Sequence, residues 1–150
     1  MRVVVQRVSR AAVRVDDELL AEIGPGALVL AGIGRDDGPA IVERMAEKLV
    51  GLRYFADAEG RTNLSVAEAG GSLLVVSQFT LYADVRRGRR PGFTAAAHPD
   101  DAVPLLERFV ERLRASGVGV GTGRFGADMA VELVNDGPFT LVIDSEPDLA

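Results

Sequence analysis

Apolar positions in the first part of the chain follow patterns typical of β-strands. Arg2–Val15 is rich in valine with polar residues interspersed, and a second run, Glu18–Ile23, follows the acidic break at Asp16-Asp17. This pattern predicts a β-hairpin. After the turn Gly24-Pro25-Gly26, residues 27–33 are almost continuously apolar, which predicts a central strand covered on both faces.

Two segments have the spacing of amphipathic helices. The first begins at Pro39 and ends at Gly51, and the second begins near Asp100-Asp101 and stops at Gly117. Pro104 is tolerated because it falls in the first turn of the second helix. The apolar faces are formed by Val42, Met45, Ala46 and Leu49 in the first helix, and by Leu105, Leu106, Phe109, Val110 and Leu113 in the second.

The remaining apolar runs predict further strands. Residues 73–77 form a buried strand that runs directly into residues 78–82. Residues 129–134 and 139–143 are rich in β-formers and predict two strands around a tight turn, Asn135-Asp136-Gly137-Pro138. The pattern therefore predicts one α+β domain over residues 1–150, with about seven or eight strands in mixed or antiparallel sheets and two main helices.

Composition excludes several kinds of chemistry. The chain has 150 residues and no cysteine, so disulfides, thiolate nucleophiles and thiolate-bound metals are ruled out. The first residues carry charges within the apolar run, and no apolar stretch approaches the ~20 residues of a membrane span. We expect a cytoplasmic protein without membrane association.

The distribution of charge leaves one candidate contact for nucleic acid. The formal net charge is -5, which gives no general attraction to a polyanion. Locally, however, four arginines stand in five positions, Arg86, Arg87, Arg89 and Arg90. This run is either a solvated loop that aids solubility or a contact for RNA phosphate, and charge alone leaves both interpretations open.

Common catalytic and cofactor motifs are missing from the sequence. His98 is the single histidine and precedes Pro99 in a predicted loop, so a Ser-His-Asp device is not expected. The chain has no HExxH motif or Walker A loop, and the glycines at 119–123 are too loosely spaced for a dinucleotide fingerprint. We therefore expect no metal and no cofactor.

One strand end combines small hydroxyl and amide groups, Ser77-Gln78-Phe79-Thr80. Taken alone, Thr80 is an ordinary β-branched residue and Gln78 a surface amide. In combination with three further motifs, however, this segment resembles the D-aminoacyl-tRNA deacylase family. The motifs are residues 81–84 followed by Arg90-Pro91, Phe125-Gly126-Ala127-Asp128-Met129, and Asn135-Asp136-Gly137-Pro138-Phe139-Thr140. Near the N-terminus, Gln6-Arg7-Val8 and Gly24-Pro25-Gly26 also fit the start of the family's pattern, so the resemblance covers residues 1 to about 145.

Two positions depart from the family's usual pattern. Phe139 replaces a valine after the glycine-proline pair, and Arg89 replaces an asparagine before the arginine-proline pair. The larger Phe139 is expected to change packing behind the turn, and Arg89 to strengthen a phosphate contact. Neither touches Gly137-Pro138 itself.

The resemblance implies a fold, an activity and a set of site residues. The fold is a barrel-like sheet with two helices, and the activity is that of a carboxylic ester hydrolase that frees D-amino acids from D-aminoacyl-tRNA. Gly137-Pro138 is implied to be a cis peptide whose carbonyls enter the active site of the partner subunit in a homodimer and reject L substrates. Glycyl-tRNA, which has no side chain to exclude, should also be hydrolysed.

Residue roles follow from this implied site. Gln78, Phe79 and Thr80 are the candidate catalytic residues, with backbone N–H groups around Phe79 and Thr80 as an oxyanion hole. Thr80 has a positioning role rather than a nucleophilic one, because no base accompanies it. The free hydroxyl of the terminal ribose of tRNA is the candidate base. The candidate substrate-binding residues are Ser77, Met129, Gly137, Pro138 and Arg7, with Arg7 holding the glycine-proline turn. The alternatives are a non-catalytic RNA-binding dimer and a structural dimer without a ligand.

Overall fold

The computed structural model describes residues 1–149 and confirms the α+β class. The strands are β1 (Arg2–Val15), β2 (Glu18–Ile23), β3 (Gly26–Gly32), β4 (Phe55–Ala56), β5 (Thr62–Leu64), β6 (Ser72–Ser77), β7 (Gly119–Thr122) and β8 (Ala130–Asp144). The helices are α1 (Pro39–Gly51), α2 (Pro99–Ala115), the short α3 (Ser145–Asp148) and the 3₁₀ helix η1 (Phe79–Tyr82).

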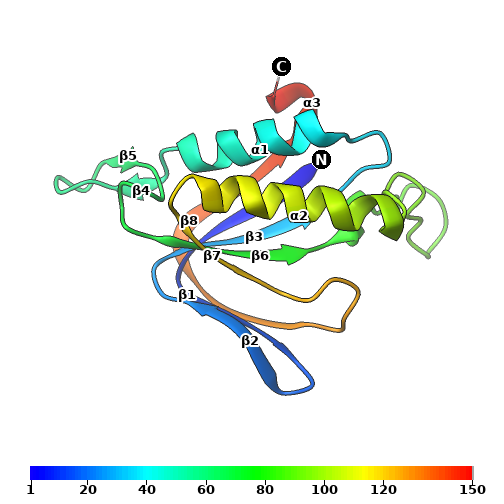
Figure 1. Ribbon diagram of the computed structural model, residues 1–150, viewed down its shortest axis with the longest axis horizontal. Coiled ribbons are helices and arrows are strands. Elements are labelled where there is room, and N and C mark those ends of the chain that lie inside the picture. Colours follow the sequence, from blue (N-terminus) through cyan, green and yellow to red (C-terminus); the bar gives the residue numbers. More distant parts are fainter. Residues whose placement is uncertain (150) are drawn as a thin grey trace.

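Strand β1 is the centre of a strongly bent sheet (Figure 1). It is antiparallel to β3 over residues 2–8, to β2 over residues 11–15, and to β8 along nearly its whole length. The sheet continues from β3 through β6 to β7 by parallel pairing. A Cβ added to Gly121 of β7 would lie 3.0 Å from the Cβ of Ala21 in β2, so the two ends of the sheet come together. The sheet is nearly closed, like the predicted barrel.

Helices α1 and α2 lie side by side on one face of this sheet (Figure 1). Helix α1 begins at Pro39, ends at Gly51 and buries the four predicted side chains. Helix α2 begins at Pro99, one residue before the predicted start, and buries Phe109 in the core beneath both helices. Arg108 and Arg112 of α2 bond to Glu43 and Glu47 of α1, each across 2.6 Å.

Strands β3 and β6 are buried on both faces, as their apolar runs predict. Val29 of β3 and Val75 of β6 pack beneath the helices, whereas Leu28 and Leu74 fill the interior of the nearly closed sheet. Burial of an aliphatic side chain of this size contributes about 1.5–3 kcal/mol. Two cores therefore hold β6 from both sides and fix the position of its C-terminal end.

The last strand corrects the prediction of two strands around a tight turn. Residues 130–144 form one strand, β8, that runs antiparallel to β1 throughout. Residues 140–144 pair with residues 2–6 of β1, and residues 130–134 pair with residues 10–14. The segment between them does not reverse the chain. It leaves the ladder as a bulge, because the register shifts on both sides of Val8.

Three strands and the two short helices, η1 and α3, were not predicted from the pattern. The short strands β4 and β5 form a separate hairpin, and β7 has a glycine-rich sequence with little strand propensity. Strand β7 forms because β6 offers it a parallel partner. Among residues 1–149, none of the helices is both long and apolar enough to cross a bilayer.

Candidate active site at the end of strand β6

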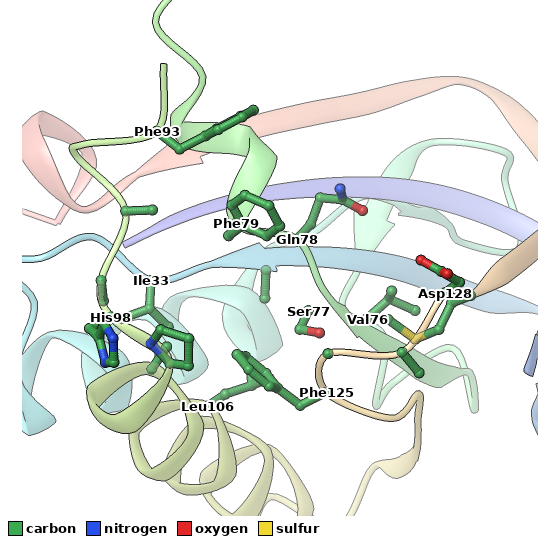
Figure 2. Close-up of a pocket in the computed structure, with 18 of the residues that line it drawn as sticks. Ile33, Val76, Ser77, Gln78, Phe79, Phe93, His98, Leu106, Phe125 and Asp128 are labelled. Carbon is green, nitrogen blue, oxygen red and sulfur yellow. The ribbon is translucent and has the colours of Figure 1, made fainter. Parts of the chain in front are cut away.

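A pocket of about 690 Å³ opens at the C-terminal end of β6 (Figure 2). Its walls are formed by the end of β6 with η1, the end of β3, residues 93–98, the first turns of α2, residues 125–129 and the start of β8. Most lining side chains are apolar, and the polar ones are Ser77, Gln78, His98 and Asp128. Pockets of this size and character hold small organic groups and orient them with a few polar contacts.

The chain changes direction at Gln78, directly after β6. The N–H of Gln78 still donates to the carbonyl of Ala31 (2.8 Å), and the N–H of Leu81 then donates to the carbonyl of Gln78 (3.2 Å) to close η1. A Cβ on Gly32 would lie 2.9 Å from the Gln78 carbonyl oxygen. Gly32 therefore lets η1 pack closely against the end of β3.

Two backbone N–H groups at this bend, those of Phe79 and Thr80, have no hydrogen-bond acceptor within residues 1–149. The N–H groups on either side of them are used in the bonds just described. The start of a helix leaves donors free in this way, because their acceptors would precede the helix. The free donors lie where the Phe79 side chain enters the pocket wall.

The Thr80 hydroxyl has a single hydrogen-bond partner within residues 1–149. It accepts a hydrogen bond from the side-chain amide of Gln78, and the Thr80 side chain is exposed rather than part of the pocket lining. His98 does line the pocket, but its Nδ1 faces Asp100, accepting from the Asp100 N–H at 3.4 Å. His98 thus caps helix α2. Among the described residues, no base bonds to the Thr80 hydroxyl.

Helix η1 is anchored at its far end by Tyr82. Burial, followed by the nearby carboxylates of Asp37 and Asp144, raises the pKa of the Tyr82 phenol well above its ordinary range. The Arg2 guanidinium lies 5.3 Å from the ring centroid and donates to the Leu81 carbonyl at 3.0 Å. The phenol therefore stays neutral at physiological pH, and η1 is held from both ends.

Met129 reaches the pocket from the loop that follows β7. The Gly123 N–H donates to the Val75 carbonyl at 3.2 Å, which ties the start of this loop to β6. A Cβ on Gly123 would collide with the Met129 sulfur, so glycine at this position makes room for that side chain. Ser77, Gln78, Phe79 and Met129 thus surround one pocket, whereas Thr80 lies beside it.

The bulge of β8 carries the glycine-proline pair. The Gly137–Pro138 peptide bond is cis, as the resemblance implies, and both residues are exposed. Arg7 donates to the carbonyls of Asp136 (3.0 Å) and Gly137 (3.2 Å), and its guanidinium lies 4.5 Å from the centroid of the Phe139 ring.

Arg7 also connects this bulge to the body of the protein. Its Nη1 donates to the Tyr54 carbonyl at 2.6 Å, its Nε lies 3.1 Å from the Asp136 carboxylate, and its side chain is 11% exposed. Phe139, the residue that departs from the family pattern, supplies the aromatic face under the guanidinium. Arg7 therefore clamps the bulge to β1 and to the segment after α1.

Within one chain, the glycine-proline segment does not line the pocket. Arg7 is paired with Ala27 at the start of β3, whereas Gln78 bonds to Ala31 near the end of β3. Four residues of strand correspond to about 13 Å. The two predicted parts of the site are therefore separate surfaces of the same molecule.

The four predicted arginines lie on an exposed loop, residues 85–91. Backbone hydrogen bonds between Asp84 and Gly92 close its base. Arg86 binds the Asp84 carboxylate through Nε (2.9 Å) and Nη2 (2.7 Å). The Arg86 guanidinium holds the pKa of the Asp84 carboxyl well below its usual range.

Several pocket residues were not assigned from the sequence. Phe93, Leu106 and Ala97 line the pocket, but their side chains carry no chemical signal that separates them from core residues. Phe125 and Asp128 belong to a motif that was recognised, yet only Met129 of that motif was assigned to the site. Among residues 1–149, no group of three His, Cys, Asp or Glu side chains is arranged to hold a metal ion.

Comparison with known proteins agrees with this picture. The family model described as D-Tyr-tRNA(Tyr) deacylase matches residues 4–144. A D-aminoacyl-tRNA deacylase of Symbiobacterium thermophilum is 62% identical and one of Roseiflexus sp. (strain RS-1) is 59% identical, with 97% of this chain covered in each case and 97% and 94% of the relatives.

Solved structures show the same fold. The structure titled c-Myc DNA Unwinding Element Binding Protein superposes with a TM-score of 0.90 at 38% identity, over 96% of this chain and 98% of that one. A probable eukaryotic D-amino acid tRNA deacylase superposes with a TM-score of 0.80 at 21% identity, over 95% and 97% of the two chains, and supports the fold alone. With a family match over nearly its whole length, the chain belongs to the D-Tyr-tRNA(Tyr) deacylase family.

Proposed function

We propose that this protein is a D-aminoacyl-tRNA deacylase, a hydrolase that cleaves the ester between a D-amino acid and the 3′ end of tRNA. The observation that carries the proposal is the bend at residues 78–80, where two free backbone N–H groups adjoin a mostly apolar pocket. The family match spans this bend, and the relatives that cover nearly the whole chain bear the same name. A tRNA substrate also implies a cytoplasmic protein.

The free N–H groups of Phe79 and Thr80 are the proposed oxyanion hole. Hydrolysis of an ester passes through a tetrahedral intermediate whose oxygen becomes negatively charged. Main-chain donors that are already in place stabilise that oxygen without reorganising, and the loss of one such donor costs roughly 2.7–4 kcal/mol in known hydrolases. An ester of this kind is reactive, so this stabilisation supplies a large part of the catalysis it needs.

Thr80 has a positioning role and does not attack the ester as a nucleophile. Its hydroxyl bonds to the Gln78 amide and has no base as a partner within residues 1–149, so no side chain there removes its proton. A nucleophilic water therefore needs a proton acceptor from elsewhere, and the hydroxyl beside the ester on the terminal ribose is the candidate. This hydroxyl takes the proton of the attacking water and passes its own proton to the ester oxygen that leaves, which becomes a free ribose hydroxyl of tRNA. In this scheme Gln78 and Thr80 keep the bend in the geometry that presents the two N–H groups.

Selection against L substrates is assigned to the bulge of a second subunit. The carbonyls around Gly137 and Pro138 are exposed, clamped by Arg7 and distant from the pocket of their own chain. Placed in a partner's pocket, they would accept from the substrate's α-ammonium group and collide with an L side chain. Steric exclusion discriminates more strongly than the roughly 1–3 kcal/mol of a methylene-sized contact difference. Glycyl-tRNA has no side chain to exclude and is therefore also a substrate.

The surface of β8 supports a homodimer. Strand β8 lies at the edge of the sheet, beyond β1, and its Leu133, Val134 and Val142 are 40%, 41% and 64% exposed. Apolar side chains on an exposed edge strand are a liability for a monomer. A two-fold dimer covers the same patch on both subunits and brings each bulge to its partner.

A subunit-mixing experiment tests the function and the shared site together. Ala127→Trp should block the pocket from its own loop, and Gly137→Trp should block the partner's pocket, because Ala127 lines the pocket and Gly137 is exposed. Each variant alone is expected to be inactive on D-tyrosyl-tRNA. Equal mixing after dissociation should restore about a quarter of wild-type activity, since half of the dimers then contain one intact site.

The outcomes separate the alternatives. Wild-type protein that binds tRNA but does not hydrolyse D-tyrosyl-tRNA would make the chain a non-catalytic RNA-binding dimer. Activity of the wild type without restoration on mixing, while native mass spectrometry shows that mixed dimers form, would place both parts of the site within one chain. A monomer with full activity would remove the shared site altogether.

A further inference from the structure

The arginine loop, residues 85–91, stands at the rim of the pocket. Its base is closed by the Asp84–Gly92 pair, with N···O distances of 2.7 and 2.9 Å, and the chain then continues into Phe93. The ring of Phe93 meets the ring of Phe79 edge-on at 5.1 Å between centroids, and both rings line the pocket (Figure 2). The base of the loop therefore directly precedes a residue of the pocket wall.

The four arginines of this loop are not equivalent. Arg86 is neutralised by Asp84, which accepts from its Nε, its Nη2 and its backbone N–H. Arg87, Arg89 and Arg90 are exposed and form no ion pair within residues 1–149. Gly88, with φ of 71°, provides the left-handed turn that separates Arg87 from the other two.

This arrangement is unusual for a chain with more acidic than basic residues. The chain has 22 Asp and Glu against 17 Lys and Arg, and most arginines outside the loop have a carboxylate within 4 Å. The loop instead concentrates three unpaired guanidinium groups. Arginine binds phosphate oxygens in a bidentate manner and is the side chain best suited to that purpose.

We propose that Arg87, Arg89 and Arg90 bind backbone phosphates of the nucleotides that precede the aminoacylated nucleoside, while Arg86 and Asp84 hold the base of the loop. This inference rests on the proposed function, because a terminal nucleoside in the pocket directs the rest of the strand across the rim. The loop thus supplies local attraction for RNA that the net charge of the chain does not.

The size of the effect follows from counter-ion release. Each phosphate contact on a single strand contributes about 0.7 to the slope of log affinity against log salt. Three contacts contribute about 2. Between 50 and 200 mM salt, the wild type should therefore lose about 20-fold more affinity for tRNA than a variant without these contacts.

The test compares two triple variants with equal charge change. Arg87→Gln/Arg89→Gln/Arg90→Gln removes the proposed contacts, and Arg44→Gln/Lys48→Gln/Arg61→Gln removes three exposed charges that also have no ion pair within residues 1–149. Affinity for tRNA is measured against salt. Hydrolysis is measured on D-tyrosyl-tRNA and on the D-tyrosine ester of adenosine, which carries no phosphate.

The loop variant is expected to lose affinity for tRNA with a flatter salt slope, to show a raised KM on D-tyrosyl-tRNA, and to hydrolyse the adenosine ester at the wild-type rate. The control variant should keep the wild-type slope. An unchanged slope in the loop variant, an equal change in both triple variants, or an equal loss on the adenosine ester would overturn the inference. Wild-type protein inactive on both substrates would instead refute the proposed function.

Discussion

Replacement of Arg7 by methionine tests whether the clamp on the β8 bulge controls selection. The guanidinium donates to the carbonyls of Tyr54, Asp136 and Gly137, and it covers the face of the Phe139 ring. Methionine retains much of the apolar stem but none of the donors. The substitution therefore releases the bulge and leaves the pocket at the end of β6 untouched.

The expected loss of stability is worked from these contacts. A hydrogen bond to a charged group contributes about 1.5–3 kcal/mol, but the exposed carbonyls of Asp136 and Gly137 regain water, so only the bond to Tyr54 counts in full. The aromatic contact adds about 0.5–1 kcal/mol, and the ion pair with the exposed Asp136 adds less. We expect a total of about 2–3 kcal/mol, which lowers Tm by about 4–12 °C in a protein of this size.

Arg7→Met should also lose discrimination between D and L substrates. With the bulge released, the ratio of the hydrolysis rates on D-tyrosyl-tRNA and L-tyrosyl-tRNA is expected to fall at least about tenfold, or about 1.4 kcal/mol of transition-state discrimination. Arg53→Met is the matched control. Arg53 likewise donates to a backbone carbonyl, that of Asn63 (2.9 Å), and it binds Glu68, but it is 55% exposed and forms no hydrogen bond with the bulge within residues 1–149. The control should lose under about 1 kcal/mol and keep its selectivity.

Two results would refute this reasoning separately. An Arg7→Met protein with a wild-type Tm would show that the contacts of Arg7 do not hold the bulge. A destabilised but dimeric Arg7→Met protein with the wild-type D-to-L ratio would show that the bulge is not the chiral filter. The Tm and the D-to-L ratio of Arg7→Lys should lie between those of the wild type and Arg7→Met, because an ammonium group keeps the charge but cannot reach three carbonyls at once.

Three further predictions concern the site and the core. Thr80→Ala should keep activity within about tenfold of wild type, because its N–H remains, and a rate at background would restore the nucleophile model. Excess EDTA should leave the rate unchanged, and loss that zinc reverses would contradict a metal-free site. Tyr54→Phe should raise the free energy of unfolding by about 1 kcal/mol in urea titrations, because the buried Tyr54 hydroxyl has no partner within residues 1–149. Burial raises the pKa of the Tyr54 phenol above that of the unfolded chain, so the wild-type free energy of unfolding is retained below about pH 10 and falls above it as the unfolded chain deprotonates. A Tyr54→Phe variant that loses as much stability above about pH 10 would contradict this assignment to Tyr54.

Much of the fold was predictable because local patterns and tertiary packing agree. Helix α1 has its proline, its apolar face and its final glycine where isolated helices have them, and it begins and ends as predicted. Strands β3 and β6 are continuously apolar because each faces two cores. The strand end at Ser77 follows from the same run, since it marks the point where both cores end.

The β8 bulge was mistaken for a turn because local sequence and tertiary pairing disagree. Asn135, Asp136, Gly137 and Pro138 are typical turn residues, and nothing nearby shows that both flanking runs pair with the same long strand. The register with β1 decides the outcome, and register is a non-local property. Phe93 was missed for a similar reason, because only the folded chain brings it against Phe79.

The geometry of strand pairing explains why one chain does not complete the proposed site. Strand β6 lies between β3 and β7, so its N–H groups are used until it outruns both partners, the last pair being Ser77 with Ala31. Free donors arise only beyond that point, at Phe79 and Thr80. Exposed acceptors arise at the other interruption of pairing, where the bulge of β8 takes the Gly137 carbonyl out of the backbone ladder with β1, and this carbonyl accepts from the Arg7 side chain instead. The sheet keeps these two interruptions about 13 Å apart along β3. In the proposed function, the donors that bind the oxyanion and the acceptors that bind the ammonium group therefore come from different subunits, and we expect selectivity to depend on dimerisation.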